Sequence, residues 1–128
     1  MSREVITSAS APAAVGPYSQ AIKAGGFVFC SGQIPVHPGT GEMRTGSIGE
    51  ATEQCLKNLQ AVLAAAKCKL ADAVQVNVFL ADMNDYAAMN EAYAKFFPSD
   101  PPARVAVAVA ALPKGVPIEI ALTAVDRS

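Results

Sequence analysis

The two segments that decide the fold read RVAVAVA over residues 104–110 and IEIALT over residues 118–123. Each alternates large aliphatic residues with small or polar ones, which is the period-two pattern of a half-buried β-strand. A Pro-Lys-Gly sequence at 113–115 lies between them and predicts a turn. We expect the Val, Ile and Leu side chains to pack in the core, and Arg104 and Glu119 to share the opposite, Ala-lined face.

A first helix is predicted over the residues that follow Ser47. Ser47 and Glu50 match a capping box, in which the hydroxyl and the carboxylate each bond a free backbone N–H of the first turn. Behind this start lies an apolar stripe at helical spacing, made of Cys55, Leu59, Val62 and Ala66.

A second helix is predicted between Asp82 and Pro98. The polar segment 82–85 offers several N-cap oxygens, and Pro98 cannot continue a helix. We interpret the stripe at helical spacing between these limits as core packing and not as a cofactor site. Its members are Tyr86, Met89, Tyr93 and Phe96.

Further strand signals complete the order of elements. Residues 4–7 form a short candidate, and residues 18–24 and 27–33 flank a Gly-Gly pair that predicts a hairpin. Residues 74–80 place Val and Leu at alternate positions, with one strongly apolar face. The order of strands, helix, strand, helix and strands predicts a two-layer α+β domain, with a mixed six-stranded sheet and both helices on one face.

The composition fits one domain spanning residues 1–128. Hydrophobic residues make up 52% of the chain and charged residues 16%, against a usual charged fraction of about 25%, which excludes a disordered protein. No stretch is long and apolar enough for a membrane span, and the N-terminus lacks a signal-peptide pattern, so we expect a cytoplasmic protein. Three cysteines without a C-x-x-C pair argue against a disulfide framework. So few charges leave little polar surface, which favours self-association.

Arg104 and Glu119 are the candidate functional residues, and each has a structural alternative. Arg104 opens an uncharged strand, where it either discourages edge-strand aggregation or binds a carboxylate or phosphate with its planar fork of donors. Glu119 occupies a strand interior, where it either pairs with a base such as Arg104 or holds and activates a water molecule. The sequence has no glycine-rich phosphate loop and no metal-ligand cluster, so neither a metal nor a cofactor is expected.

Across nearly its whole length the sequence resembles the RidA/YjgF/UK family of small imine deaminases, which also carries the names endoribonuclease L-PSP and translation inhibitor. The resemblance includes residues 11–20, 31–34 and 84–93. Its most specific part is the C-terminal signature, which runs from Pro102-Ala103-Arg104-Val105 through residues 110–115 to Ile118-Glu119-Ile120.

The resemblance implies a chorismate-mutase-like α+β fold that assembles as a homotrimer with clefts between subunits. The implied reaction is the hydrolysis of 2-aminoacrylate and related 2-imino acids to 2-keto acids and ammonia, which protects pyridoxal-phosphate enzymes from these compounds. Small 2-imino and 2-keto carboxylates are the ligands it implies. Imines already hydrolyse in water, so such an enzyme has mainly to orient the substrate and one water molecule.

The same resemblance implies roles for individual residues. Arg104 matches the residue that binds the substrate carboxylate, Glu119 the residue that positions water, and Tyr18 a tyrosine that lines the cleft. The surrounding substrate-binding positions are matched by Ser31, Gly32, Asn90 and Ala106. Many deaminase members carry Cys where this chain has Ala106, so a contact there through the backbone is kept while any role of a thiol is lost.

Two functions of other classes stay open. One is RNA cleavage with translation inhibition, although a net charge of −1 gives little attraction to a polyanion. The other is a non-catalytic module in which Arg104 binds a small carboxylate without turnover. Release of ammonia from 2-aminoacrylate distinguishes a deaminase from both.

Overall fold

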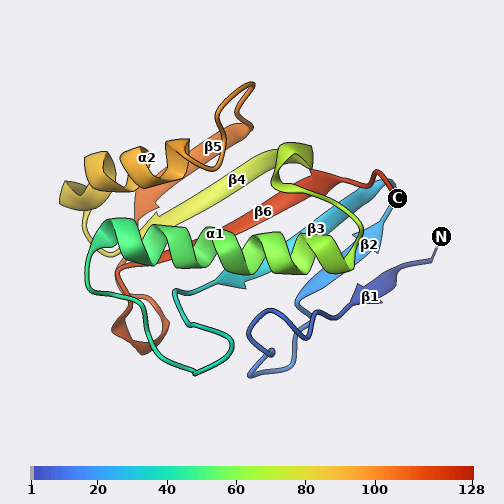
Figure 1. Cartoon of the computed structure of the whole chain (residues 1–128), viewed down its shortest axis with the longest axis horizontal. Coiled ribbons are helices and arrows are strands. Elements are labelled where there is room, and N and C mark those ends of the chain that lie inside the picture. Colours follow the sequence, from blue (N-terminus) through green and yellow to red (C-terminus); the bar gives the residue numbers. More distant parts are fainter. Residues whose placement is uncertain (1) are drawn as a thin grey trace.

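Six strands form one mixed sheet in the order β1-β2-β3-β6-β4-β5 (Figure 1). The computed structural model describes residues 2–128. Neighbouring strands are antiparallel except β4 and β5, which are parallel, so the prediction of a mixed six-stranded sheet is confirmed. The strands are β1 (Glu4–Ile6), β2 (Ala21–Ala24), β3 (Phe27–Gln33), β4 (Ala73–Leu80), β5 (Ala103–Ala108) and β6 (Ile118–Val125).

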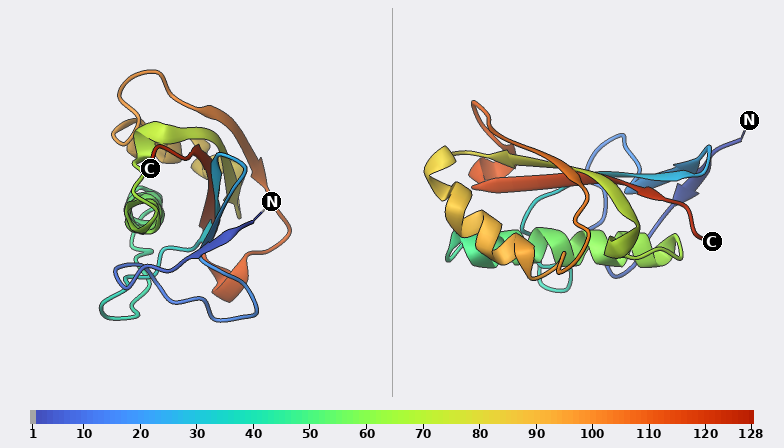
Figure 2. Two further views of the ribbon diagram at one scale, coloured as in Figure 1. Left: turned by 90° about the vertical axis from the view of Figure 1, so that its right-hand side faces the viewer. Right: turned by 90° about the horizontal axis from the view of Figure 1, so that it is seen from above.

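Two helices, α1 (Ile48–Ala65) and α2 (Tyr86–Ala94), cover the same face of the sheet. Figure 2 gives an edge-on view in which α1 and α2 both lie on one side of the strands. The segment that contains α2 makes the crossover that the parallel pair β4 and β5 requires. The predicted two-layer α+β architecture is confirmed. No helix in the described part of the chain is long and apolar enough to cross a membrane.

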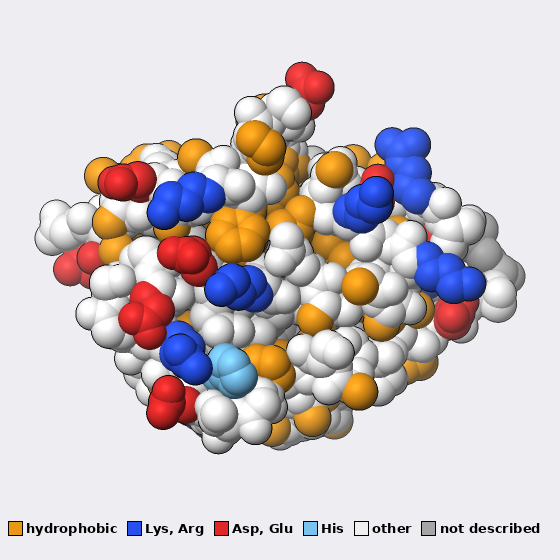
Figure 3. All heavy atoms as spheres, viewed as in Figure 1, with side chains coloured by type: hydrophobic (Ala, Val, Ile, Leu, Met, Phe, Trp, Pro, Cys, Tyr) orange, Lys and Arg blue, Asp and Glu red, His pale blue; other side chains and the backbone are white. Residues whose placement is uncertain are grey.

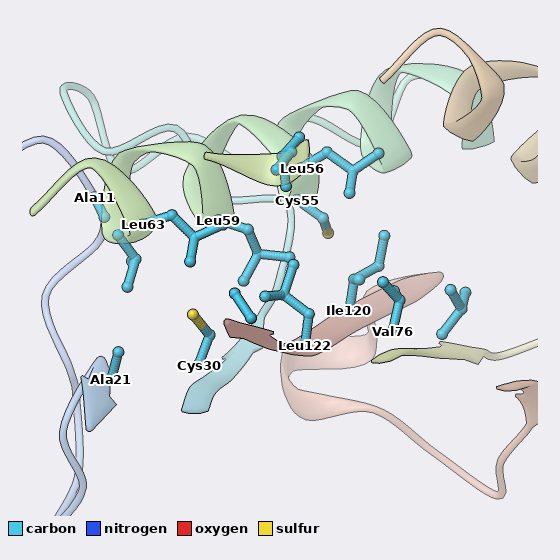
Figure 4. Packing of buried hydrophobic residues seen from close by; sticks show 14 of the residues in the cluster. Ala11, Ala21, Cys30, Cys55, Leu56, Leu59, Leu63, Val76, Ile120 and Leu122 are labelled. Carbon is cyan, nitrogen blue, oxygen red and sulfur yellow. The ribbon is translucent and has the colours of Figure 1, made fainter. Parts of the chain in front are cut away.

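The core lies between α1 and the centre of the sheet (Figure 4). Cys55 and Leu59 of α1 point toward Ile120 and Leu122 of β6. Burial of each such leucine stabilises the fold by about 1.5–3 kcal/mol. The predicted apolar stripe of α1 is confirmed, because every member is buried: Cys55, Leu59, Val62 and Ala66.

Both helical segments begin at a capped turn. The Ser47 hydroxyl accepts a hydrogen bond from the backbone N–H of Glu50 at 3.1 Å, which confirms the Ser47 half of the predicted capping box. The reciprocal bond from the backbone N–H of Ser47 to the Glu50 carboxylate is not formed among the described residues. Asp82 Oδ1 accepts a hydrogen bond from the backbone N–H of Asn84 at 2.9 Å. This second cap serves the 3₁₀ turn η2 (Met83–Asp85), and α2 continues directly from it.

The second helix differs from the prediction at its end and on one of its faces. α2 ends at Ala94, before Pro98 is reached. Met89 and Tyr93 of its stripe are buried, which confirms core packing for them. Tyr86 is 36% exposed, so it does not belong to the core.

The two faces of β5 are the reverse of those predicted. Arg104 stands level with Val76 of β4, which stands level with Leu122 of β6, and both of these partners are buried. Residues that are level across a sheet share a face, so Arg104 lies on the helix-covered side. Alternation defines which residues of a strand share a face, but register with β4 decides which face meets the helices. The prediction that Arg104 and Glu119 share a face is therefore wrong.

In β6 and β4 the predicted faces are confirmed, except at one residue of β4. In β6, Ile118, Ile120 and Leu122 are buried, and Glu119 lies on the opposite face. Val74 was expected on the apolar face of its strand but is 41% exposed. The register of β4 against β6 shifts at this point, and such an irregularity turns a side chain away from its regular direction.

The helix-free face of the sheet carries exposed apolar side chains. Those of Phe27 and Phe29 come from β3, and those of Val105 and Val107 come from β5. We call this set the apolar sheet face. Exposed apolar side chains on one face of a sheet are typical of an interaction site on a folded protein.

Candidate functional site

The structure divides the predicted site residues, apart from Ala106, into two groups at separate places. One cleft, of about 450 Å³, lies at the ends of β3 and β6. A second cleft, of about 360 Å³, lies between α2 and the start of β5. The first contains the carboxylate half-site, which we define as Tyr18, Ser31, Gly32 and Glu119. The second contains Asn90, Tyr93 and Arg104, which together with the adjoining Tyr86 we define as the arginine half-site.

In the carboxylate half-site, Glu119 lies against Gly32. A Cβ atom on Gly32 would overlap Glu119 Oε2 and lie 2.9 Å from its Cδ, so only glycine admits the carboxylate in this position. The register of β3 against β6 shifts at this place, between Cys30 and Gln33. Burial raises the pKa of Glu119 above its ordinary value, because the charged form loses water contacts. A carboxyl with a raised pKa exchanges protons closer to neutral pH.

The two hydroxyls of this half-site differ in what they can offer a ligand. Tyr18 Oη accepts a hydrogen bond from the backbone N–H of Val15 at 3.4 Å, which leaves its own proton free to donate. Ser31 Oγ donates to the carbonyl oxygen of Ser19 at 2.6 Å. The Ser31 hydroxyl can therefore only accept a bond from a ligand, whereas that of Tyr18 can donate one.

In the arginine half-site, the guanidinium of Arg104 lies beside two tyrosine rings of α2. Arg104 Cζ is 4.8 Å from the ring centroid of Tyr93 and 5.5 Å from that of Tyr86, within the range of cation–π attraction. Arg104 Nη2 also donates a hydrogen bond to Tyr86 Oη at 2.9 Å. No carboxylate within residues 2–128 forms an ion pair with Arg104. Its charge and remaining N–H groups are available to an anion.

The two tyrosines experience this charge differently. A hydrogen bond from the Asn90 side chain and the charge of Arg104 lower the pKa of Tyr86. Burial raises the pKa of Tyr93, and the charge of Arg104 opposes that rise. Within the described residues, Tyr93 Oη is buried without a hydrogen-bond partner. Tyr93 therefore meets Arg104 with its ring alone, whereas Tyr86 meets it with a ring and a hydroxyl.

The two half-sites of one chain do not meet. Strand β4 lies between β5 and β6, and Glu119 stands level with Phe79 of β4 and so with Val107 of β5. Two strand spacings and three residues along the strand put the backbones of Arg104 and Glu119 roughly 14 Å apart. Their side chains also leave opposite faces of the sheet. A ligand that touches both groups therefore requires two copies of the chain.

Ala106 lies apart from both clefts. Its side chain packs against the hydrophobic core on the helix-covered side, level with Val78 of β4. Any ligand contact at this position would use the backbone of β5, which is the edge strand of the sheet. Replacement of a larger side chain by Ala at this position leaves that backbone in place.

Sequence reasoning missed the part that Tyr86 takes in the site. Tyr86, Asn90 and Tyr93 are spaced by four and three residues, which places them on one face of a helix. That spacing was the available signal, but an aromatic residue at core spacing is usually buried. The contact with Arg104 depends on where β5 passes α2, and local pattern does not reveal this.

The chemistry of the two half-sites is complementary. An arginine without a carboxylate partner binds a carboxylate through parallel N–H···O bonds. A partly desolvated carboxylate can hold a water molecule and accept its proton. Together they would bind a small carboxylic acid and direct a water molecule at it. Figure 3 shows that, on the helix-covered face, Lys and Arg are interspersed with Asp and Glu and form no continuous basic surface.

Comparison with other proteins gives this arrangement a context. The family model for endoribonuclease L-PSP matches residues 8–126. A RutC family protein of Pyrococcus horikoshii is 55% identical over 118 residues, which cover 92% of this chain and 94% of that protein. The human 2-iminobutanoate/2-iminopropanoate deaminase is 46% identical over 124 residues, which cover 97% of this chain and 90% of that protein.

Solved structures agree with the sequence relatives. The crystal structure of Escherichia coli TdcF with bound serine superposes with a TM-score of 0.92 at 41% identity, covering 98% of this chain and 99% of that chain. The similarity in sequence and in fold extends over both half-sites. The chain belongs to the endoribonuclease L-PSP family, which includes the Rid and RutC proteins.

Proposed function

We propose that this protein is an enamine and imine deaminase, which hydrolyses 2-aminoacrylate and related 2-imino acids to 2-keto acids and ammonia. It would thereby protect pyridoxal-phosphate enzymes in the cytoplasm from these reactive compounds. The observation that carries the proposal is the pair of complementary groups: Arg104, which has no carboxylate partner, and Glu119, whose carboxyl is partly desolvated. The name and 46% identity of the human relative support the same reaction.

The proposed active form is a homotrimer whose sites lie between subunits. The exposed apolar sheet face needs a cover, and the two half-sites of one chain point away from each other. A head-to-tail arrangement brings the arginine half-site of one copy to the carboxylate half-site of the next, and such contacts close into a ring. A ring of three agrees with the resemblance drawn from the sequence and gives three equivalent sites.

In the proposed reaction, Arg104 binds the substrate carboxylate and fixes the position of C2. An enamine substrate first gains a proton at C3 and becomes the iminium ion. Glu119 of the neighbouring copy holds a water molecule and accepts its proton as the water oxygen bonds to C2, which gives a neutral carbinolamine. Glu119 returns this proton to the nitrogen, and as the C–N bond breaks and ammonia leaves, the hydroxyl group gives its own proton to Glu119 and becomes the carbonyl of the 2-keto acid.

The remaining site residues take supporting roles in the proposal. Tyr18 lines the cleft, and its hydroxyl donates a hydrogen bond to the bound molecule. Ser31 accepts a hydrogen bond, and Gly32 leaves room for the carboxylate of Glu119. Asn90 lines the cleft beside the guanidinium of Arg104. Ala106 offers the ligand only its backbone groups, because its side chain packs against the core.

The decisive assay measures ammonia and pyruvate release from 2-aminoacrylate generated in situ by a pyridoxal-phosphate enzyme. We expect purified protein at micromolar concentration to accelerate release above the spontaneous rate. The absence of any acceleration would contradict the deaminase function. Binding of 2-oxobutanoate without acceleration would instead support a carboxylate-binding module. Cleavage of single-stranded RNA that persists through rigorous repurification and is lost on Glu119→Gln substitution would support the ribonuclease hypothesis.

A further inference from the structure

The orientation of the Arg104 side chain depends on a contact outside its own strand. Arginine has a long, flexible side chain, and a free guanidinium samples many directions. Here the guanidinium has one hydrogen bond to a side chain of the described chain, from Nη2 to Tyr86 Oη at 2.9 Å. The neighbouring Tyr93 ring offers a surface at 4.8 Å but no polar partner. Tyr86 therefore supplies the directional contact.

We propose that Tyr86 is a positioning residue whose hydroxyl holds the guanidinium of Arg104 in the orientation that receives a substrate carboxylate. The inference rests on the proposed function, since it assigns to Tyr86 a part in binding the same substrate. Tyr86 acts through Arg104 and does not itself need to touch the reacting atoms.

The placement of Tyr86 suits this role. It is the first residue of α2 and follows the turn that Asp82 caps, so its backbone is anchored on both sides. A tyrosine side chain has only two rotatable bonds before its ring, so its hydroxyl is a well-defined acceptor. A phenol held in this way limits the directions open to Arg104.

The same geometry leaves the arginine able to bind a ligand. Tyr86 accepts one N–H of five, and within residues 2–128 no carboxylate competes for the others. Tyr86 is 36% exposed, whereas the core residue Met89 on the same helix is fully buried. At this exposed position Tyr86 adds little to core packing, but its contact with Arg104 orients the guanidinium in the site.

The test compares Tyr86→Phe with the wild type in steady-state kinetics. Phe retains the ring and the start of α2 and removes only the acceptor for Arg104. Because pre-orientation favours binding of substrate and transition state alike, we expect KM to rise about tenfold and kcat to stay within about twofold. Tyr93→Phe deletes the hydroxyl that has no partner and should raise KM clearly less. Equal KM values for Tyr86→Phe and wild type, or equal effects of the two variants, would overturn the inference.

Two further measurements separate this inference from general structural damage and from the proposed function. If Tyr86 acts through Arg104, then Tyr86→Phe should lower kcat/KM no further in an Arg104→Met background, and additive effects would contradict the role. An NMR titration with 2-oxobutanoate does not depend on turnover. We expect the Tyr86→Phe variant to bind it about tenfold more weakly than the wild type. Equal affinities of the variant and the wild type, or no binding by the wild type, would overturn the inference even if deamination is observed. If the variant binds more weakly but the wild type shows no deamination, only the proposed function is contradicted.

Discussion

The two half-sites of one chain are built in different ways. The carboxylate half-site stands on β3 and β6, where the strand register shifts between Cys30 and Gln33 and Gly32 lies against Glu119. The arginine half-site joins an edge strand to a short helix, and its charge is held by the side chains of Tyr86 and Tyr93. The position of Glu119 in the carboxylate half-site depends on its close approach to the backbone at Gly32. The position of Arg104 in the arginine half-site depends on contacts with other side chains.

The contrast extends to the electrostatics. Burial works against the charge of Glu119 and raises its pKa. The charge of Arg104 is supported by two aromatic rings and by a hydroxyl acceptor. In the proposed reaction, the carboxylate gains a proton and the cation binds the substrate anion. Because the two groups lie on opposite faces of one chain, the proposal takes them from two different copies.

The largest effect is expected from a change that separates the copies and so disables both half-sites together. Phe29→Glu places a charge on the apolar sheet face. Burial of three such charges in a trimer costs several kcal/mol, so the variant should be a monomer of 13.2 kDa and lose activity, whereas the wild type should give roughly 40 kDa by light scattering. Gln60→Glu adds the same charge to the exposed side of α1 and should stay trimeric and active. An active monomeric Phe29→Glu protein would contradict the intersubunit site.

Removal of the charge from the arginine half-site should have the next largest effect. Arg104→Met keeps the length of the side chain but deletes its charge and its N–H donors. Loss of charge-assisted bonds to the substrate carboxylate should lower kcat/KM about 100-fold, which corresponds to about 3 kcal/mol. Arg127→Met is the matched control, because Arg127 is exposed and pairs with Asp72 at 3.2 Å, away from both clefts. Equal activities of the two variants would remove Arg104 from the proposed mechanism.

A smaller effect is expected from crowding the carboxylate half-site. Gly32→Ala forces Glu119 away from its place, since the new Cβ would overlap Oε2. We expect kcat to fall about tenfold, because misplacement of a catalytic group by a few tenths of an ångström is costly but leaves its chemistry intact. Gly49→Ala adds a methyl group that would lie 3.8 Å from Ser47 Oγ, an ordinary van der Waals contact, and it should keep full activity. An unchanged kcat for Gly32→Ala would argue against a role for the position of Glu119.

The mildest test changes only the pH. Glu119 must be ionised to accept a proton from water, so kcat should fall as the pH drops through its pKa. Because burial raises that pKa, the fall should be centred above 4.5, the value of an exposed glutamate. The pH profile of kcat, corrected for spontaneous hydrolysis, measures this directly. A Glu119→Gln variant should lose the acidic limb, and its persistence there would assign the limb to another group.

Features set by neighbouring residues in the sequence could be predicted. The Ser47 cap, the Gly-Gly hairpin between β2 and β3 and the faces of β6 all depend on local patterns, and each agrees with the structure. The faces of β5 could not be predicted, because they depend on its register with β4, which is distant in sequence. Val74 was misplaced because a register shift interrupts the alternation.

The candidate site shows the same division. Arg104 and Glu119 stand out in the sequence because each is a charge in an apolar strand. Their separation onto opposite faces follows from strand order and register, which two isolated strand patterns do not contain. The contact of Tyr86 with Arg104 likewise joins segments 18 residues apart, and it is visible only once α2 lies beside β5.

The central claim, that each site takes Arg104 from one copy and Glu119 from another, is tested most directly by mixing two inactive variants. Arg104→Met and Glu119→Gln chains are coexpressed, and the mixed trimers are assayed for ammonia release from 2-aminoacrylate. In randomly mixed trimers, about a quarter of the intersubunit sites contain both native residues, so we predict recovery of up to about a quarter of wild-type activity. Mixed trimers with no more activity than either variant alone would place both residues in one chain's site and contradict the account.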